Sequence, residues 1–197
     1  MRITFDLDDV IFDTRPLFKR AFQNTGYTFL KYTEYTDWDL RKCYDDDVVN
    51  ELLKLFADDI MYKMRVLDKK IPYILNNLMQ KPNMEVLFVT ERILKQPQKT
   101  FNQLLNAGIK CSFEQVYDQE GKKSDILREL KPDFHFDDSP RVIKECIEKD
   151  IPIVMISNGS TKYNHFLRGT VPHYPTLRTA LIKLGIYKHI HINKYPR

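Results

Sequence analysis

Long apolar runs are missing from this sequence, and cysteine and glycine are scarce. No apolar stretch approaches the roughly 20 residues that cross a bilayer, and the chain starts directly with a strand-like segment instead of a signal peptide. The three cysteines, Cys43, Cys111 and Cys146, have no CxxC spacing, which is unlike a disulfide framework. We therefore expect a soluble cytoplasmic protein with reduced thiols and no membrane partner.

The bulk composition is that of one globular core. Hydrophobic residues make up 43% of the 197 residues, and this length suits one core with a modest insertion. Only six residues are glycine, which excludes a fibrous glycine-rich chain. The formal charge of +4 suits anionic substrates such as phosphates but falls short of a nucleic-acid-binding signature.

Two aspartates, Asp6 and Asp8, follow an apolar, strand-forming start. Side chains two residues apart on an extended chain point the same way, so both carboxylates face one small volume. Carboxylates that are forced together repel unless a cation lies between them or one keeps its proton. The pair therefore indicates a metal site, acid–base chemistry or both. An acidic turn is the plain alternative, whereas a calcium loop would need a ligand at Val10 and a later bidentate Glu.

Apolar periodicity predicts alternating strands and helices along the chain. Expected helices cover 16–25, 48–64, 67–80, 98–107, 124–130, 141–149 and 176–184, and expected strands cover 85–89, 134–136 and 151–156, with a short strand within 111–116. Such alternation predicts a three-layer α/β fold, a parallel sheet with helices on both faces. We expect residues 1–14 and 67–197 to form this core. Residues 15–66 are expected to form a small helical cap, inserted after the first strand over the edge where open α/β sheets bind ligands.

Three further positions near predicted element ends carry polar groups. Thr90 follows the strand 85–89, the pair Asp137 and Asp138 follows the strand 134–136, and Lys122 and Lys123 precede the helix 124–130. A second acidic pair at a strand end is costly to hold without a cation. Each feature also has a structural interpretation, since a threonine after a strand is common and a lysine pair suits a solvated turn.

In chain order, these positions resemble the four motifs of the haloacid dehalogenase (HAD) superfamily of phosphatases and phosphotransferases. Motif I is an apolar strand followed by Asp-x-Asp, as at Asp6 and Asp8, and motif II is the Ser or Thr at Thr90. Motif III is a lysine at a helix start, for which Lys123 fits the apolar spacing better than Lys122. Motif IV is the Asp137–Asp138 pair. The resemblance covers most of the chain outside the cap and implies a Rossmann-like HAD fold.

The resemblance also implies residue roles and a cofactor. Asp6 would attack phosphorus to form an aspartyl-phosphate, and Asp8 would act as general acid and then base. Thr90 and Lys123 would stabilise the phosphoryl oxygens. Mg²⁺ would be held by the Asp6 carboxylate, the Asp8 backbone carbonyl and a motif IV acid, with Asp138 favoured and Asp137 beside it.

One position departs from the family pattern. Asp9 stands where relatives often have glycine. We expect the turn after the nucleophile to be tighter or differently hydrogen-bonded here, without loss of a catalytic group.

The substrate is predicted to be a small phosphorylated molecule, with a nucleotide favoured. The cap is rich in aromatic rings that can stack a base, and Phe12 and Trp38 are the rings expected to face the site. Glu91 and Arg92, next to Thr90, complete the predicted substrate-binding residues. The layout also loosely resembles the 5′(3′)-deoxyribonucleotidase branch, including a late segment at 162–164. This second resemblance implies a 5′-nucleotidase acting on (deoxy)nucleoside monophosphates.

Other functions stay open. The same motifs serve sugar phosphatases, and they serve nucleic-acid end phosphatases, for which the mild positive charge leaves room. From another class, the chain could be a binding module with an idle HAD core. All four motif positions are filled, which favours an enzyme.

Overall fold

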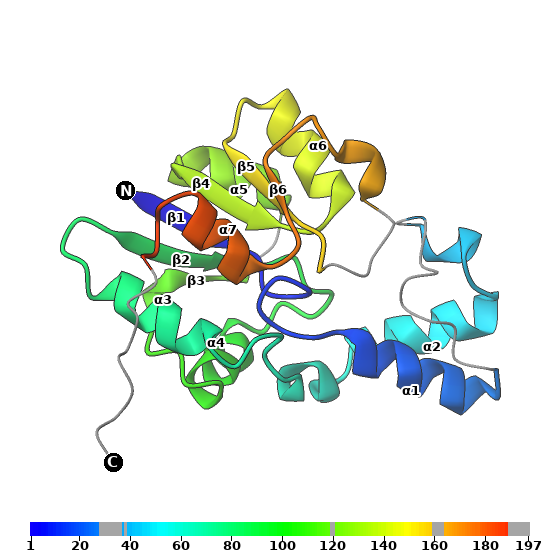
Figure 1. The fold of residues 1–197 in the computed structure, drawn as a ribbon. Coiled ribbons are helices and arrows are strands. Elements are labelled where there is room, and N and C mark those ends of the chain that lie inside the picture. Colours follow the sequence, from blue (N-terminus) through cyan, green and yellow to red (C-terminus); the bar gives the residue numbers. More distant parts are fainter. Residues whose placement is uncertain (28–36, 38, 119–120, 159–163, 189–197) are drawn as a thin grey trace, which may run out of the picture.

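The computed structural model describes residues 1–27, 37, 39–118, 121–158 and 164–188. Within these ranges the centre of the molecule is a six-stranded sheet in the order β3-β2-β1-β4-β5-β6, with every neighbouring pair parallel. The strands are β1 (Arg2–Phe5), β2 (Glu85–Val89), β3 (Val116–Tyr117), β4 (Phe134–Asp137), β5 (Ile153–Ile156) and β6 (His173–Tyr174). Helices cover both faces (Figure 1), so the predicted Rossmann-like α/β class is confirmed.

Seven α-helices connect or flank these strands in the described ranges. They are α1 (Arg15–Thr25), α2 (Asp46–Phe56), α3 (Ile71–Met79), α4 (Pro97–Asn106), α5 (Lys123–Leu130), α6 (Pro140–Glu148) and α7 (Leu177–Lys183). Within the same ranges, no helix combines the length and the apolar character that crossing a membrane demands.

Alternation along the strands divides the core between the two faces of the sheet. Ile3 and Phe5 of β1 belong to a large cluster with residues of α3 and α7, whereas Thr4 between them points to the opposite face. The second face carries a smaller cluster built from α5, α6 and β5. Because side chains alternate, a polar residue in this sheet lies on a face that the strand register fixes.

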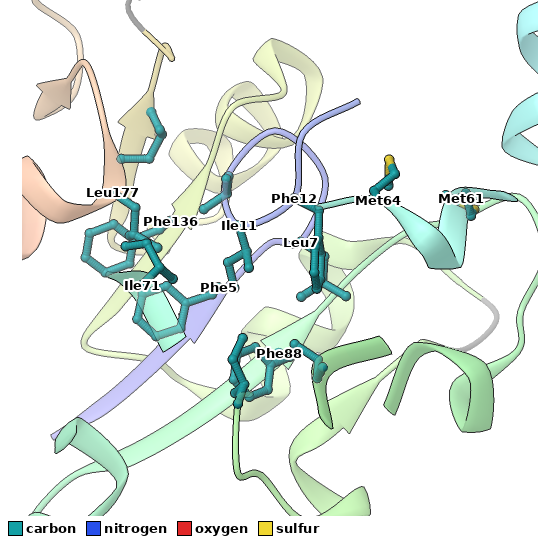
Figure 2. Close-up of a cluster of buried hydrophobic side chains, with 14 of the residues drawn as sticks. Phe5, Leu7, Ile11, Phe12, Met61, Met64, Ile71, Phe88, Phe136 and Leu177 are labelled. Carbon is teal, nitrogen blue, oxygen red and sulfur yellow. The ribbon is translucent and has the colours of Figure 1, made fainter. Parts of the chain in front are cut away.

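Aromatic rings fill the centre of the larger cluster (Figure 2). Phe5 lies opposite Phe88 on β2 and Phe136 on β4, and the Phe5 and Phe136 rings stack with centroids 5.1 Å apart. Stacked buried rings contribute beyond the area they bury. This contact fixes the register between β1 and β4, and with it the position of the residues that follow each strand.

Two expected helices are shorter in the structure. The helix expected to run to residue 64 ends at Phe56, because Asp58 turns the chain by accepting a hydrogen bond from the Ile60 amide at 2.9 Å, and a 3₁₀ helix (Asp59–Lys63) follows. The helix expected from residue 67 begins at Ile71, next to Pro72, which lacks the amide hydrogen needed inside a helix.

The sheet edges were predicted least well. The short strand expected within 111–116 occupies Val116–Tyr117 after a 3₁₀ turn, and β6 was not predicted. Each of these strands is two residues long, which gives no detectable period in the sequence.

The helices of the region predicted to be a cap lie beyond the carboxyl edge of the sheet. Figure 1 shows α1 and α2 packed side by side and displaced from the strands. Their buried residues include Phe18, Phe22 and Leu52, and the rings of Phe18 and Phe22 contact Tyr44. The division into a core of 1–14 and 67–197 and a cap of 15–66 stays a prediction.

Phe136→Ala should lower the free energy of unfolding by about 3–5 kcal/mol, because it leaves a cavity in the aromatic centre. Urea denaturation provides the measurement. Phe166→Ala is the matched control: this ring is 60% exposed and contacts Lys144, so its loss should cost less than about 1 kcal/mol. Equal losses in the two variants would contradict the assigned core.

Candidate active site

The carboxyl ends of the central strands surround a cavity of about 260 Å³. Asp6 follows β1, Thr90 follows β2, and Asp138 follows β4, so parallel strands bring these three residues to one edge. The cavity is lined by Asp6, Asp8, Asp9, Thr14, Phe18, Leu40, Phe56, Met61, Thr90, Glu91, Arg92, Ile93, Lys123, Asp138, Ser139, Arg141 and Val142.

A buried lysine joins two of the strand ends. The amide of Asp6 donates to the Phe136 carbonyl at 2.9 Å, which extends the β1–β4 ladder and sets Asp6 beside Asp137. Lys123, the first residue of α5, places its Nζ 2.7 Å from Asp6 Oδ1 and 2.8 Å from Asp137 Oδ2. All three side chains are almost fully buried, so the ammonium and the two carboxylates act as one charged group.

The pKa values of the two carboxyl groups in this charged group are shifted in opposite directions. Burial raises the pKa of Asp6 to about 7, and the neighbouring Asp137 and Asp8 carboxylates add to the effect while Lys123 opposes it. Burial also acts on Asp137, but Lys123 and His135 outweigh it and hold the pKa of Asp137 well below its usual range. For Lys123, burial is outweighed by the two carboxylates, which raise its pKa. Of the two carboxylates, Asp6 is therefore the one whose negative charge is less fully compensated.

Asp137 is held on both of its oxygens. Its Oδ2 also meets His135 Nε2 at 3.0 Å, and its Oδ1 accepts the Ser139 amide at 2.8 Å. Burial lowers the pKa of His135, which favours a neutral imidazole. A neutral ring that donates from Nε2 to a carboxylate accepts at Nδ1, where the Thr4 hydroxyl lies 2.8 Å away. His135 lies within β4 and is completely buried.

The second aspartate of the opening pair has a different partner. Arg92 binds Asp8 through two parallel contacts, Nη2 to Oδ1 at 2.8 Å and Nε to Oδ2 at 3.1 Å. The guanidinium is buried, and although burial lowers the pKa of Arg92, Asp8 raises it overall. The Asp8 side chain is 23% exposed and lines the cavity, so the ion pair holds a solvent-accessible carboxylate in a fixed orientation.

The turn after β1 depends on Asp9. Its φ is 56°, the left-handed region in which glycine is preferred. The Asp9 carboxylate accepts bonds from the amide and the hydroxyl of Thr14, and the Asp9 amide donates to the Phe12 carbonyl at 2.8 Å. Hydrogen bonds made by the Asp9 side chain thus offset the conformational cost of a residue other than glycine at this position.

The site contains a set of oxygen ligands that suits a hard cation. In the described part of the chain, carboxylate oxygens of Asp6, Asp137 and Asp138 lie within 4.8 Å of one another. Such a donor set fits Mg²⁺, and the raised pKa of Asp6 indicates negative charge that a cation would neutralise. Asp138 lines the cavity, whereas Asp137 is already bonded by Lys123, His135 and Ser139.

The other wall of the cavity is apolar and comes from the helical region. Phe18 of α1, Phe56 of α2, and Leu40 and Met61 of the 3₁₀ helices line it. Opposite the acidic cluster the cavity therefore offers hydrocarbon and aromatic contacts instead of charge. The rim carries the ion pair between Glu91 and Arg141.

Most of the residues predicted for the site are brought together, with two exceptions. Phe12 was expected to face the substrate, but this ring is fully buried in the core and does not line the cavity (Figure 2). The reason is the tight turn at 7–12, which folds Phe12 back toward the sheet. Trp38 lies outside the described residues. Lys122 is exposed immediately before α5, and Lys123 holds the buried position.

Several residues at the site were not singled out from the sequence. Arg141 lies in the first turn of α6, and a signal for it was present, because Ser139-Pro140 is a helix-start pattern directly after the acidic pair. Asn158 follows β5 and donates to the Asp9 carbonyl, and Asn164 donates to the Asp138 carbonyl at 3.1 Å. Position after the fifth parallel strand could have indicated Asn158, and Asn164 ends the segment 162–164, which the sequence offered only as a resemblance and without a role at the site.

Comparison with solved structures identifies the fold as that of haloacid dehalogenase-like hydrolases. A hydrolase of this family from Streptococcus pneumoniae aligns with a TM-score of 0.65 at 15% identity, covering 93% of this chain and 97% of that one. YfnB from Bacillus subtilis, described as a putative HAD-hydrolase and bound to magnesium, gives 0.56 at 14% identity, covering 93% and 98%. CbbY from Rhodobacter sphaeroides, in complex with phosphate, gives 0.52 at 16% identity, covering 89% and 94%.

Within this fold class the sequence itself gives a narrower assignment. The family model described as "Protein of unknown function (DUF2608)" matches residues 1–139, and the chain belongs to that family. The match includes Asp6, Asp8, Thr90, Lys123 and the Asp137–Asp138 pair, and it ends one residue after Asp138. A comparison with curated proteins gave no match.

The electrostatics of Asp6 predict a pH-dependent effect of Asp6→Asn on the metal-free protein. The unfolded chain loses the Asp6 proton near 3.8, but the folded chain keeps it up to about 7, so stability falls as pH rises through this window. Asparagine carries no such proton. The variant should gain stability relative to wild type, on the order of 2–4 kcal/mol, between pH 4 and pH 8.

Chemical denaturation in EDTA at several pH values measures this difference. Asp150→Asn, an exposed position at the opposite edge of the sheet, should leave the two stability curves parallel. If the stability difference between Asp6→Asn and wild type is also independent of pH, the assigned burial of the Asp6 carboxylate is contradicted.

Proposed function

We propose that this protein is a Mg²⁺-dependent phosphomonoester hydrolase that works through an aspartyl-phosphate intermediate and acts on (deoxy)nucleoside monophosphates. The observation that carries the proposal is the Asp6–Lys123–Asp137 group at the edge of a HAD-type sheet, with Asp8 beside it facing a cavity. A nucleophile, a cation and an acid–base group within one cavity suit phosphoryl transfer.

Asp6 is the nucleophile in this proposal. It follows the central strand, and its amide is tied to β4, so its carboxylate approaches phosphorus from a fixed direction. Attack forms the phosphorus–oxygen bond to Asp6 and breaks the ester bond to the leaving alcohol. The Lys123 ammonium and the Thr90 hydroxyl line the same cavity and stabilise charge on the phosphoryl oxygens.

Asp8 is the acid–base residue. It lies two positions after Asp6 and faces the cavity, where it protonates the departing oxygen and then takes a proton from the hydrolytic water. The ion pair with Arg92 fixes the orientation of its carboxylate. An Asp8 side chain that rotated freely would spend less time aligned with the leaving group.

The acidic cluster would hold the cofactor. Asp6, Asp138 and the Asp8 backbone carbonyl are the proposed ligands for Mg²⁺, with Asp137 behind them. When bound, the ion would neutralise the phosphate dianion and keep the Asp6 carboxylate ionised. The Bacillus subtilis protein with the same fold was determined with magnesium and the Rhodobacter sphaeroides protein with phosphate, which supports this proposal.

A nucleotide fits the two-sided character of the cavity. The phosphate would lie against Asp6, Lys123 and Thr90, and the organic part would contact the apolar wall that includes Phe18 and Phe56. A base can stack on such rings, whereas a sugar phosphate would leave them in contact with hydroxyl groups.

Phosphate release from nucleoside 5′- and 3′-monophosphates in the presence of Mg²⁺ tests the proposed reaction. Asp6→Asn should reduce kcat by a factor on the order of 10³ or more, because the nucleophile is lost. Asp150→Asn is the matched control and should retain wild-type kcat. Equal activity of wild type and Asp6→Asn would refute the assignment of the nucleophile.

The same assay with a wider panel tests the substrate class. If sugar phosphates are hydrolysed far faster than nucleotides, the proposal of a nucleotidase is wrong. A preference for a 3′-phosphorylated oligonucleotide would favour a nucleic-acid end phosphatase. Absence of turnover on every substrate would favour the idle binding module.

Phe56→Ala tests the apolar wall directly. It should raise KM for nucleoside monophosphates about tenfold, since an aromatic contact with the base is lost. The KM for phosphoserine, which has no ring, should change little. Leu53→Ala on the same helix is the control, because Leu53 is exposed and does not line the cavity. A uniform rise in KM for both substrates would argue against a base-binding wall.

A further inference from the structure

The buried guanidinium of Arg92 is held by more than its ion pair with Asp8. Its Nη1 donates to Gln103 Oε1 at 2.8 Å and lies 3.4 Å from Thr100 Oγ1, on the side away from Asp8. The Tyr62 ring covers its face, with the centroid 5.3 Å from Cζ. Arg92 therefore connects the cavity with a polar cluster behind it, formed by Thr100 and Gln103. The orientation of its guanidinium depends on that cluster.

Gln103 is the central residue of this cluster. It lies on α4 with only 3% of its surface exposed, and it uses both ends of its amide. Its Oε1 accepts from Arg92, and its Nε2 donates to the Met61 carbonyl at 3.0 Å. Met61 belongs to the 3₁₀ helix Asp59–Lys63 and lines the apolar wall of the cavity. The Gln103 amide thus connects Arg92, which orients Asp8, to the 3₁₀ helix whose Met61 lines the apolar wall of the cavity.

We propose that Gln103 is a positioning residue: it fixes the Asp8 carboxylate through Arg92 and locks that orientation to the backbone at Met61. The inference rests on the proposed function, in which Asp8 is the acid–base residue. Gln103 itself touches neither the cavity nor the reacting atoms.

A competing acceptor gives Gln103 its importance. Asp118 lies behind Arg92, where its Oδ2 accepts the Thr100 hydroxyl at 2.6 Å. Its Oδ1 is buried and has no hydrogen-bond partner within the described ranges. A buried carboxylate oxygen in this position attracts a guanidinium. Gln103 Oε1 accepts the hydrogen bond from Arg92 Nη1 and so keeps the guanidinium oriented toward Asp8. Without Gln103, Arg92 can turn toward Asp118 and release Asp8.

Gln103→Met tests the proposal, since methionine has a similar length but makes neither hydrogen bond. Loss of a positioned general acid matters most for substrates whose leaving group is a poor one. The kcat/KM for nucleoside monophosphates, which release an alkyl alcohol, should fall about tenfold or more. The kcat/KM for 4-nitrophenyl phosphate, which releases an acidic phenol, should fall less than about twofold.

Gln115→Met is the matched control. Gln115 also bridges two segments with its amide, accepting from the Ser112 amide at 2.7 Å and donating to the Val86 carbonyl at 2.8 Å. It does not line the cavity. This variant should leave the ratio of the two kcat/KM values unchanged. If Gln103→Met lowers both substrates equally, Gln103 has only a structural role and the proposal is wrong.

Crystal structures of the variants separate this proposal from the proposed function. In Gln103→Met we expect the two Arg92–Asp8 contacts to be lost, whereas Gln115→Met should retain them. An inactive wild-type protein would refute the hydrolase, but unchanged Arg92–Asp8 contacts in Gln103→Met would refute the positioning role whether or not the protein is active. If Gln103→Met does not fold, Gln103→Asn serves, because its shorter side chain cannot reach Arg92 and Met61 together.

Discussion

The Lys123 ammonium between Asp6 and Asp137 is the interaction on which the remainder of the site depends. Two carboxylates at the ends of neighbouring parallel strands, both buried, would repel strongly without it. The lysine reaches them because α5 begins at this residue, so the start of a helix and the ends of two strands are held by one charge. The neutralisation is incomplete, since the pKa of Asp6 stays raised to about 7. Ionised Asp6 is therefore unfavourable without a further positive charge, which makes the position suited to a cation.

The aromatic core determines where these charges lie. Stacking of Phe5 on Phe136 sets the register of β1 and β4, and one residue later the chains reach Asp6 and Asp137 on the opposite face. A slip of either strand by one residue would turn its acid to the wrong face of the sheet. Asp8 is held separately, by Arg92 and the polar cluster around Gln103. Asp6 and Asp137 are thus positioned by the sheet, and Asp8 is positioned by contacts that lead through Arg92 to α4 and to the segment that contains Met61.

The sequence was most informative where local pattern and position in the sheet coincide. The strand Glu85–Val89 has the predicted bounds, and α1, α4, α5, α6 and α7 begin and end within about two residues of the predictions. The ends of strands can be predicted because apolar runs stop at polar residues. Since the carboxyl ends of parallel strands lie at one edge of a sheet, the sequence alone predicts that Asp6, Thr90 and the Asp137–Asp138 pair are neighbours. The two-residue strand β6 was not predicted, and β3 lies at the end of the stretch predicted for it, since the main signal of such short strands is pairing with a partner.

The sequence by itself determined the fold class, the order of the polar strand ends and the chemistry they suggest, because periodicity and residue type are local properties. Tertiary structure alone decided which groups pair. Lys123, which the sequence already favoured over Lys122, contacts both Asp6 and Asp137, and Phe12 belongs to the core and not to the cavity. Arg92 meets Asp8, 84 positions away, and Gln103 meets Met61 across 42. Such contacts depend on how the helices close over the sheet, and no spacing along the chain encodes that distance.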